Sequence, residues 1–265
     1  MEEVPRMGIL EKLFGGGMNR TNGLAYGATD VGRKRGNNED CYRLLPDRDL
    51  YVVSDGMGGH NAGEVASLNA VEMVDKYFTP NRILEMRRDR EKIRIELMNA
   101  VLNAHEHIVG MGQKKKEYFG MGCTIAIAFI HNQEIHTCHV GDSRVCIVNQ
   151  AGIRQITHDH STVGELVDAG EMTREEARHS PLRNRLTQAL GVYSPIHPEY
   201  NEHPLHHGDK VLLYSDGLWD MLSDEEIYAI VLKDVPPENI CQKLIEKANE
   251  AGGDDNVTVI VVKDG

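Results

Sequence analysis

Short apolar runs separated by turn residues predict strands in two regions of the chain. The first region contains segments 24–31, 41–45 and 50–54, each flanked by Gly, Asn, Asp or Pro. The third segment is expected to stop at Asp55-Gly56. In the second region the expected strands span residues 124–130, 134–140, 144–148, 210–214 and 257–262. Gly141-Asp142 lies between two of these segments and is a hairpin-type signal.

Apolar residues spaced three and four positions apart predict two long helices after the first strands. The stripe of the first helix consists of Ala66, Ala70, Met73, Val74 and Tyr77. The stripe of the second consists of Ile93, Leu97, Val101, Ala104 and Ile108. The charged segment 87–92 precedes the second stripe and is expected to face solvent.

Capping signals predict shorter helices in the second half of the chain. Thr173 with Glu176 forms a capping box within an insert over about residues 161–190, and Ser223 with Glu226 caps a later helix. A last helix is expected between Pro236-Pro237 and Gly252-Gly253. This order is not βαβ alternation, and it predicts an α+β domain whose antiparallel sheets are covered by helices. We expect one domain over residues 22–265 after a flexible leader, residues 1–21.

The excess of acidic over basic residues disfavours some classes of binding partner. The chain has 265 residues, 29 of them basic and 41 acidic, for a net charge of −12. Such a balance argues against a generic nucleic-acid or anionic-membrane binder and is compatible with carboxylates that hold cations. The longest apolar run, residues 125–130, is far below the ~18 residues of a membrane span. The N-terminal segment has no sustained apolar stretch and shows no secretory signal, so we expect a cytoplasmic protein.

The five cysteines give no sign of a disulfide framework or of a cysteine zinc site. Their number is odd and no pair has CxxC spacing. We therefore expect buried, reduced thiols.

Acidic residues gather where the predicted strands end. Two strands finish in the same way, with Ser-Asp-Gly at 54–56 and at 215–217, and further acidic turns lie at 37–40, 141–143 and 254–256. Any one of these is ordinary turn chemistry. Together they place many carboxylates at strand ends, where mutual repulsion would be offset by a divalent metal. Oxygen ligands without Cys or His favour Mg²⁺ or Mn²⁺ over zinc.

The same stretches resemble the metal-dependent protein Ser/Thr phosphatases of the protein phosphatase 2C (PPM) family, in their bacterial form. Nine motifs match in order along residues 22–262, nearly the whole chain. They are 35–40 (RGNNED), 53–60 (VSDGMGGH), 63–67 (GEVAS), 122–124 (GCT), 140–144 (VGDSR), 157–161 (THDHS), 186–191 (LTQALG), 215–220 (SDGLWD) and 254–258 (DDNVT). The resemblance implies a four-layer αββα sandwich, two antiparallel β-sheets flanked by helices.

The resemblance also implies a role for each motif residue. Asp55 is similar to the carboxylate that bridges two metals, and Gly56 to the residue that lends its carbonyl. Asp216 and Asp255 resemble ligands of one metal and Glu39 that of the other, while Asp142, Asp220 and Asp216 resemble a weaker third-metal site. Arg35 resembles the phosphate clamp, which suits its planar guanidinium. Asp40 is similar to a residue that orients the attacking water. The implied cofactors are two tightly bound Mn²⁺ or Mg²⁺ ions and a weaker third.

The implied reaction is hydrolysis of phosphoserine and phosphothreonine in proteins by a water that bridges the two metal ions, with no protein nucleophile. Cys123 precedes an alternating segment, so we interpret it as a core residue and not as the nucleophile of a cysteine phosphatase. The implied partners are phosphorylated proteins, Ser/Thr kinases and their targets, and we expect a monomer.

Several positions depart from the family pattern or lie beside it. Met57 stands where some members have a His proposed as general acid. We interpret His60 as a residue of the helix entry, and His158 with His160 as structural anchors of the insert. The insert resembles the family's flap, and its arginines are Arg174, Arg178, Arg183 and Arg185.

Two other functions stay open. The first is a catalytically inactive relative that acts as a scaffold, which the complete set of predicted ligands disfavours. The second is a phosphatase of small phosphorylated molecules or of a phosphorylated sigma-factor antagonist, whose metal centre could look the same.

Overall fold

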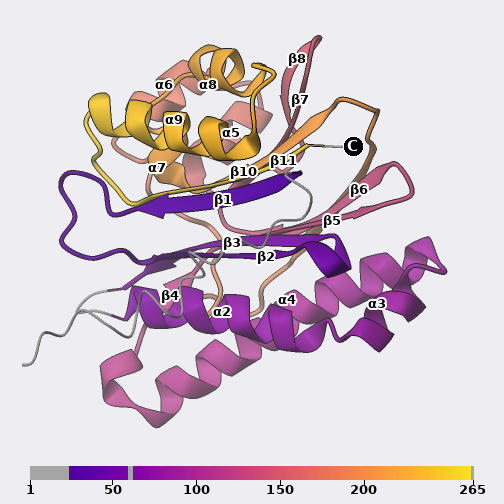
Figure 1. Ribbon diagram of the computed structural model, residues 1–265. Coiled ribbons are helices and arrows are strands. Elements are labelled where there is room, and N and C mark those ends of the chain that lie inside the picture. The colour runs from indigo at the N-terminus through magenta and orange to yellow at the C-terminus, as the bar shows by residue number, and fades with distance from the viewer. Residues whose placement is uncertain (1–23, 59–61, 264–265) are drawn as a thin grey trace, which may run out of the picture.

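The computed structural model describes residues 24–58 and 62–263 of the chain. The predicted leader, residues 1–21, and His60 lie outside this range. Two antiparallel sheets face each other, and helices cover both outer faces (Figure 1). The predicted αββα sandwich is therefore confirmed.

The first sheet has the strand order β1-β11-β10-β7-β8, and the second has the order β2-β3-β5-β6-β9, with the short β4 paired to β3. The strands of the first are β1 (Ala25–Asp30), β7 (Arg144–Asn149), β8 (Gly152–Gln155), β10 (Lys210–Tyr214) and β11 (Val257–Lys263). Those of the second are β2 (Asp40–Leu45), β3 (Leu50–Met57), β4 (Gly122–Cys123), β5 (Ile125–His131), β6 (Glu134–Val140) and β9 (Glu199–Pro204).

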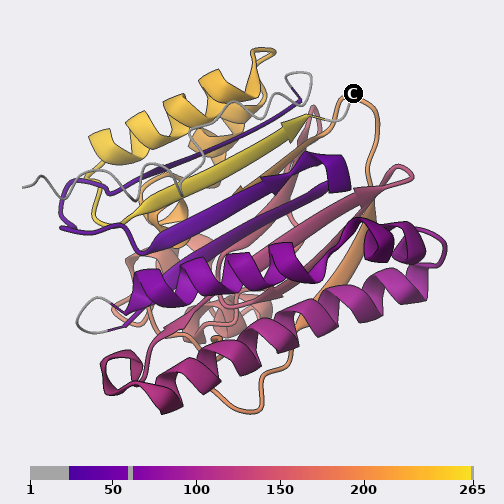
Figure 2. The same cartoon turned by 60° about the horizontal axis from the view of Figure 1, so that its bottom comes forward.

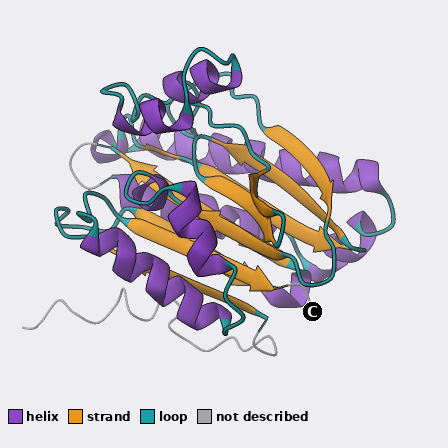
Figure 3. Cartoon of the chain, turned by 90° about the horizontal axis from the view of Figure 1, so that it is seen from above, coloured by secondary structure: helices purple, strands orange, loops and turns teal. Residues whose placement is uncertain are grey.

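Three helices cover the second sheet: α2 (Gly63–Tyr77), α3 (Pro80–Met86) and α4 (Arg90–Lys114). The long α2 and α4 run side by side across it (Figure 2). The first sheet is covered by α7 (Asp216–Trp219), α8 (Asp224–Val231) and α9 (Pro237–Glu250), while α5 (Thr162–Asp168) and α6 (Arg174–His179) lie in the insert. Seen from above, the strands lie between helices on both sides (Figure 3).

The core has three apolar layers, and the side-chain period of the strands assigns residues to them. On β5 the large Ile125, Ile127 and Phe129 pack toward the helices, whereas Ala126 and Ala128 lie between the sheets. Because successive side chains point to opposite faces of a strand, one continuous apolar run serves both layers. On β5 the inner positions are filled by small residues, while larger side chains of other strands, such as Tyr51 and Ile135, complete the same layer.

The long helix α4 follows its predicted pattern. Ile93, Leu97, Val101, Ala104 and Ile108 are all buried. Asp89 caps the helix, its carboxylate accepting a hydrogen bond from the backbone N–H of Glu91. Both predicted capping boxes are also present, at Thr173 with Glu176 and at Ser223 with Glu226.

Two predictions about strand ends are wrong. Gly141-Asp142 does not close a hairpin, because β6 belongs to one sheet and β7 to the other. Gly141 has φ +104°, a glycine conformation that lets the chain cross between the sheets. In addition, β3 does not stop at Asp55 but runs on to Met57, since Gly56 and Met57 pair with Cys123 and Gly122 of β4.

The described cysteines are all free and buried, as expected. Among residues 24–58 and 62–263, no helix combines the length and apolarity that a bilayer span requires.

The assignment of a buried face to α4 gives a direct test of the fold. Leu97→Ala is expected to lower the free energy of unfolding by about 2–5 kcal/mol, because the side chain is fully buried and leaves a cavity. Ile95→Ala, two residues away and 46% exposed, is the matched control and should stay within about 0.5 kcal/mol of wild type. Urea denaturation of both variants measures the difference. Equal losses of stability would contradict the assigned face.

Candidate functional site

Two carboxylates lie directly opposite each other at one end of the seam between the sheets. Asp40 begins β2 and pairs in register with Asp55 of β3. Tyr51 and Val53 of β3 pack between the sheets, and Asp55 continues that face by the two-residue period. Directly opposite side chains on neighbouring strands are about 5 Å apart, so like charges there repel strongly.

Ser215 connects this pair to the other sheet. Its hydroxyl donates a hydrogen bond to Asp40 Oδ2 (2.7 Å) and accepts one from the backbone N–H of Thr258 (3.0 Å). The next residue, Asp216, begins α7. A side chain at Gly217 would come within 2.0 Å of the Asn256 carbonyl oxygen, so only glycine allows this approach.

Asn256 fixes the loops that carry Glu39 and Asp255. Its side-chain oxygen accepts a hydrogen bond from the backbone N–H of Glu39 (2.8 Å). Its amide nitrogen donates to the carbonyl oxygens of Val31 and Asn37, both at 2.9 Å. One buried amide thus positions two loops that carry predicted metal ligands.

Close backbone packing brings Glu39 against the start of α2. A Cβ atom at Gly63 would lie 2.4 Å from Glu39 Oε2, and one at Gly56 would lie 2.5 Å from the Glu39 carbonyl oxygen. That carbonyl accepts hydrogen bonds from the Ser67 hydroxyl (2.5 Å) and the Gly56 N–H (3.1 Å). Glycine at both positions is therefore required by space.

Thr124 links Asp55 to the loop that carries Asp142. Its hydroxyl accepts a hydrogen bond from the Asp55 N–H (3.0 Å) and lies 2.7 Å from the Ser143 hydroxyl. Asp142 is 3% exposed. The crossover at Gly141 thereby places a third carboxylate at the same end of the seam.

We call Asp40, Asp55, Asp142, Asp216 and Asp255 the carboxylate cluster. Burial, followed by the charges of the other four members, raises the pKa of Asp55 well above its usual value. Burial raises the pKa of Asp142 to about 7 and that of Asp40 to about 6. Burial and then Asp142 and Asp255 also raise the pKa of Asp216 well above its usual value. The protein thus holds these carboxylates close together against their repulsion.

The two outer predicted ligands also belong to this site. Burial and then the nearby Glu64 raise the pKa of Glu39, while Arg35 opposes the increase. Burial raises the pKa of Asp220, opposed first by Arg183, whose Nε donates to Asp220 Oδ2 at 3.1 Å. Arg35 forms an ion pair with Asp255 (2.7 Å). All residues predicted for the site therefore come together.

The donor atoms suit a hard divalent cation. One carboxylate oxygen each of Asp40, Asp216 and Asp220 is buried with no hydrogen-bond partner among the described residues. No three carboxylates in the described part of the chain bring their oxygens within 4.8 Å of one another. Mg²⁺ keeps several waters among its ligands, so water molecules would complete the coordination of an ion between these carboxylates.

A tighter group of possible ligands lies at the start of the insert, formed by His139, His160 and Glu199. Two of its ring nitrogens are engaged: His139 Nε2 donates to the His158 carbonyl oxygen (2.6 Å), and His160 Nδ1 accepts from the Gly141 N–H (3.3 Å). His139 Nδ1 is buried and has no hydrogen-bond partner among the described residues. His160 Nε2 faces Glu199 Oε2 at 3.5 Å. Because His160 Nδ1 accepts a hydrogen bond, the ring proton is on Nε2. A metal ion bound at Nε2 would have to displace this proton while Nδ1 still accepts from the Gly141 N–H. We therefore assign the group a bracing role.

The brace agrees with the interpretation of His158 and His160 as anchors of the insert. His158 Nδ1 lies 2.6 Å from Glu199 Oε1 at the start of β9. Arg144 and Asp159 form a buried bidentate ion pair beside it, with a shortest distance of 2.6 Å.

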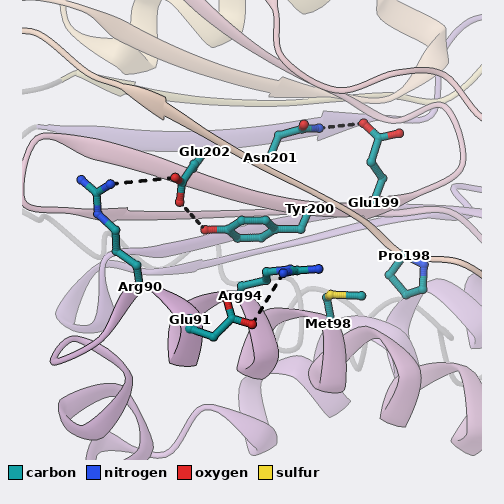
Figure 4. A pocket seen from close by; sticks show the side chains of 9 residues that line it. All are labelled: Arg90, Glu91, Arg94, Met98, Pro198, Glu199, Tyr200, Asn201 and Glu202. Atoms are coloured by element: carbon teal, nitrogen blue, oxygen red, sulfur yellow. Dashed lines mark hydrogen bonds and ion pairs between the residues drawn. The ribbon is translucent and has the colours of Figure 1, made fainter.

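A separate pocket of about 700 Å³ lies between α4 and β9 (Figure 4). No residue of the carboxylate cluster lines it. Its charged side chains pair with one another, Arg90 with Glu202 and Arg94 with Glu91. Glu202 also accepts a hydrogen bond from the Tyr200 hydroxyl. Because these charges pair within the pocket, it lacks the excess of negative charge that the carboxylate cluster has.

The residues that the sequence reasoning missed are the neutral ones that hold the carboxylates. Ser215, Thr124 and Asn256 are almost fully buried. Each belongs to one of the nine motifs. The sequence signal for their role is a polar residue beside an acidic turn, because a polar group that becomes buried there requires a hydrogen-bond partner.

Comparison with known proteins agrees with this site. The profile of the family described as Protein phosphatase 2C matches residues 14–257. The chain is 40% identical over 238 residues to "Protein phosphatase PhpP" of Streptococcus pneumoniae, covering 88% of this chain and 94% of that protein.

Solved structures extend the likeness to the fold. The serine/threonine phosphatase of S. agalactiae is 36% identical, with a TM-score of 0.81 over 91% of this chain and 99% of that one. The catalytic domain of serine threonine protein phosphatase PstP, solved in complex with two manganese ions, is 31% identical, with a TM-score of 0.78 over 90% of this chain and 96% of that one. The chain therefore belongs to the protein phosphatase 2C family and is a protein phosphatase of the bacterial type.

Proposed function

We propose that the chain hydrolyses phosphoserine and phosphothreonine in proteins and depends on two tightly bound Mn²⁺ or Mg²⁺ ions and a weaker third. The observation that carries this proposal is the gathering of buried and half-buried carboxylates from five segments at one end of the intersheet seam. The relatives named as serine/threonine phosphatases support the substrate class. The manganese complex of PstP supports the choice of ion.

The proposed ligands divide into three groups. Asp55 would be shared by the two tight ions, and the Gly56 carbonyl would be a further ligand. Asp216 and Asp255 would bind one of these ions and Glu39 the other. Asp142 and Asp220, together with Asp216, would hold the third ion. When bound, such ions lower the pKa of water and neutralise phosphoryl oxygens.

Other side chains would handle the substrate. Arg35 is half exposed and pairs with Asp255, so its guanidinium can turn from that carboxylate to a phosphoryl group. Ser215 holds Asp40, and Asp40 Oδ1 has no hydrogen-bond partner in the described part of the chain, which suits an acceptor that orients a water molecule. Met57 carries no titratable proton, so it cannot protonate the leaving oxygen.

The proposed partners are Ser/Thr kinases and their target proteins, with a monomeric enzyme acting in the cytoplasm. The reduced, buried cysteines support a reducing compartment. Turnover of phosphothreonine peptides with Mn²⁺ distinguishes this function from its alternatives. An inactive scaffold would show no turnover, and an enzyme for small phosphorylated molecules would hydrolyse those far better than peptides.

Asp216→Ala is expected to remove phosphatase activity while leaving the fold intact, because it deletes a proposed metal ligand at the start of a short helix. The loss should exceed the roughly 10- to 100-fold typical of an outer-shell change. Asp224→Ala is the matched control, since Asp224 also begins a helix but lies outside the cluster. Steady-state assays with Mn²⁺ after EDTA treatment measure both. Near wild-type turnover by Asp216→Ala would disprove the metal assignment.

Arg35→Ala is expected to raise KM for phosphopeptides by roughly 10- to 100-fold, equivalent to about 1.5–3 kcal/mol for a charged hydrogen-bonding partner. The Mn²⁺ titration midpoint should not weaken, because Arg35 competes with cations for Asp255. Lys34→Ala removes the neighbouring positive charge, which pairs with Asp254, and serves as the control. A weakened Mn²⁺ midpoint with an unchanged KM would contradict the clamp role.

Asp142→Asn is expected to stabilise the protein in EDTA at pH 8. The pKa of Asp142 is about 7 in the folded protein and about 4 in the unfolded chain. The wild-type protein is therefore more stable in acid, where Asp142 is protonated, and loses this stability as the pH rises through 7. The gain of the variant over wild type should therefore grow from pH 4.5 to 8, as measured by thermal unfolding.

The control for this prediction is Asp209→Asn. Asp209 is equally buried, but its carboxylate accepts hydrogen bonds from Asn149 Nδ2 (3.0 Å) and the His206 N–H (2.9 Å). That substitution should lower stability or leave it unchanged. A loss of stability by Asp142→Asn at pH 8 would show that repulsion does not dominate at Asp142.

A further inference from the structure

An apolar strip leads away from the carboxylate cluster. Met57 follows Asp55 by two residues on β3, so both side chains lie on the same face of the strand. A Cβ atom at Gly122 would lie 3.5 Å from Met57 Cγ and 2.5 Å from Val192 Cγ2, so both side chains lie beside Gly122. Tyr193 follows Val192, and Phe119 lies on the loop just before Gly122. We call Met57, Val192, Tyr193 and Phe119 the apolar strip.

Hydrogen bonds hold the strip in place beside the insert. Cys123 and Leu190 exchange two backbone hydrogen bonds of 3.1 and 2.9 Å, which fix the loop that carries Val192 against β4. The Tyr193 hydroxyl donates to the Leu186 carbonyl oxygen at 2.9 Å, near the end of the insert. Val192 and Tyr193 are therefore fixed between β4 and the insert.

The outer part of the strip is unusually open to solvent. Phe119 is 85% exposed, Val192 46% and Tyr193 39%. Large apolar side chains gathered beside a polar site are typical of a binding surface. The fold itself gains little from a phenylalanine that is almost fully exposed.

We propose that the apolar strip binds a large apolar side chain of the phosphoprotein substrate, close to its phosphoserine or phosphothreonine. This rests on the proposed function, which places the phosphoryl group at the carboxylate cluster. The chain carries a net charge of −12, so long-range electrostatics oppose an anionic phosphopeptide. Contact with apolar surface does not suffer from that repulsion.

The spacing limits which substrate residue reaches the strip. Two residues along β3 span about 7 Å, and the next strand adds about 5 Å. An extended peptide advances about 3.3 Å per residue. The recognised side chain therefore lies about two to four residues from the phosphorylated one.

The test uses phosphothreonine peptides in which one leucine is moved through positions −4 to +4 in a serine background, with p-nitrophenyl phosphate as the small substrate. Wild type should prefer the best leucine peptide over the all-serine peptide by roughly 10-fold in kcat/KM. The double variant Phe119→Ser, Val192→Ser should lose most of that preference and keep its activity on p-nitrophenyl phosphate. Leu84→Ser with Val235→Ser removes comparably exposed apolar groups elsewhere and should change neither.

Two results would overturn the proposal: wild type that shows no leucine preference, or a preference that survives in the double variant. Sedimentation velocity of both proteins tests the other occupant, a second copy of the chain. A dimer that dissociates in the double variant, with peptide preference unchanged, would assign the strip to self-association. Failure to hydrolyse any substrate would instead contradict the proposed function.

Discussion

Repulsion among carboxylates at one end of the intersheet seam is the constraint on which the site depends. Asp40 and Asp55 face each other across paired strands, and Asp142, Asp216 and Asp255 reach the same place from other segments. A protein tolerates such a group only if the surrounding fold holds it in place. The two sheets supply that rigidity through a closely packed inner layer and through glycines that let loops approach.

Neutral hydrogen bonds and ion pairs hold the mutually repelling carboxylates in place. The Ser215 hydroxyl donates a hydrogen bond to Asp40 and so links the two sheets. The Asn256 side chain accepts a hydrogen bond from the Glu39 N–H and so links two acidic loops. Arg35 pairs with Asp255 of the cluster, and Arg183 pairs with the outer Asp220. Because Arg183 belongs to the insert, the charge balance of the site and the position of the insert are physically coupled. The same carboxylates that destabilise one another provide the oxygen donors of a divalent-cation site.

Local patterns in the sequence predicted most elements and the acidic turns, and the family resemblance named the candidate site residues, but neither predicted how some segments pair. The apolar stripe of α4 is strictly periodic, so it was predictable, whereas the short β4, the polar β9 and the one-turn α7 carry no such period. The end of β3 was misplaced because its last residues pair with β4, a partner distant in sequence. Gly141-Asp142 has the composition of a hairpin turn, and only the packing of two sheets shows that it is a crossover. The roles of Thr124 and Asn256 likewise arise from contacts between distant segments.

The central claim is that the carboxylate cluster holds divalent cations. Anomalous diffraction from crystals grown with Mn²⁺, collected at the manganese absorption edge, tests it most directly. The account predicts peaks beside Asp55 and Asp216, with a weaker one near Asp142. Peaks at His139, His160 and Glu199 instead, or none at the cluster under Mn²⁺ concentrations that support turnover, would contradict it.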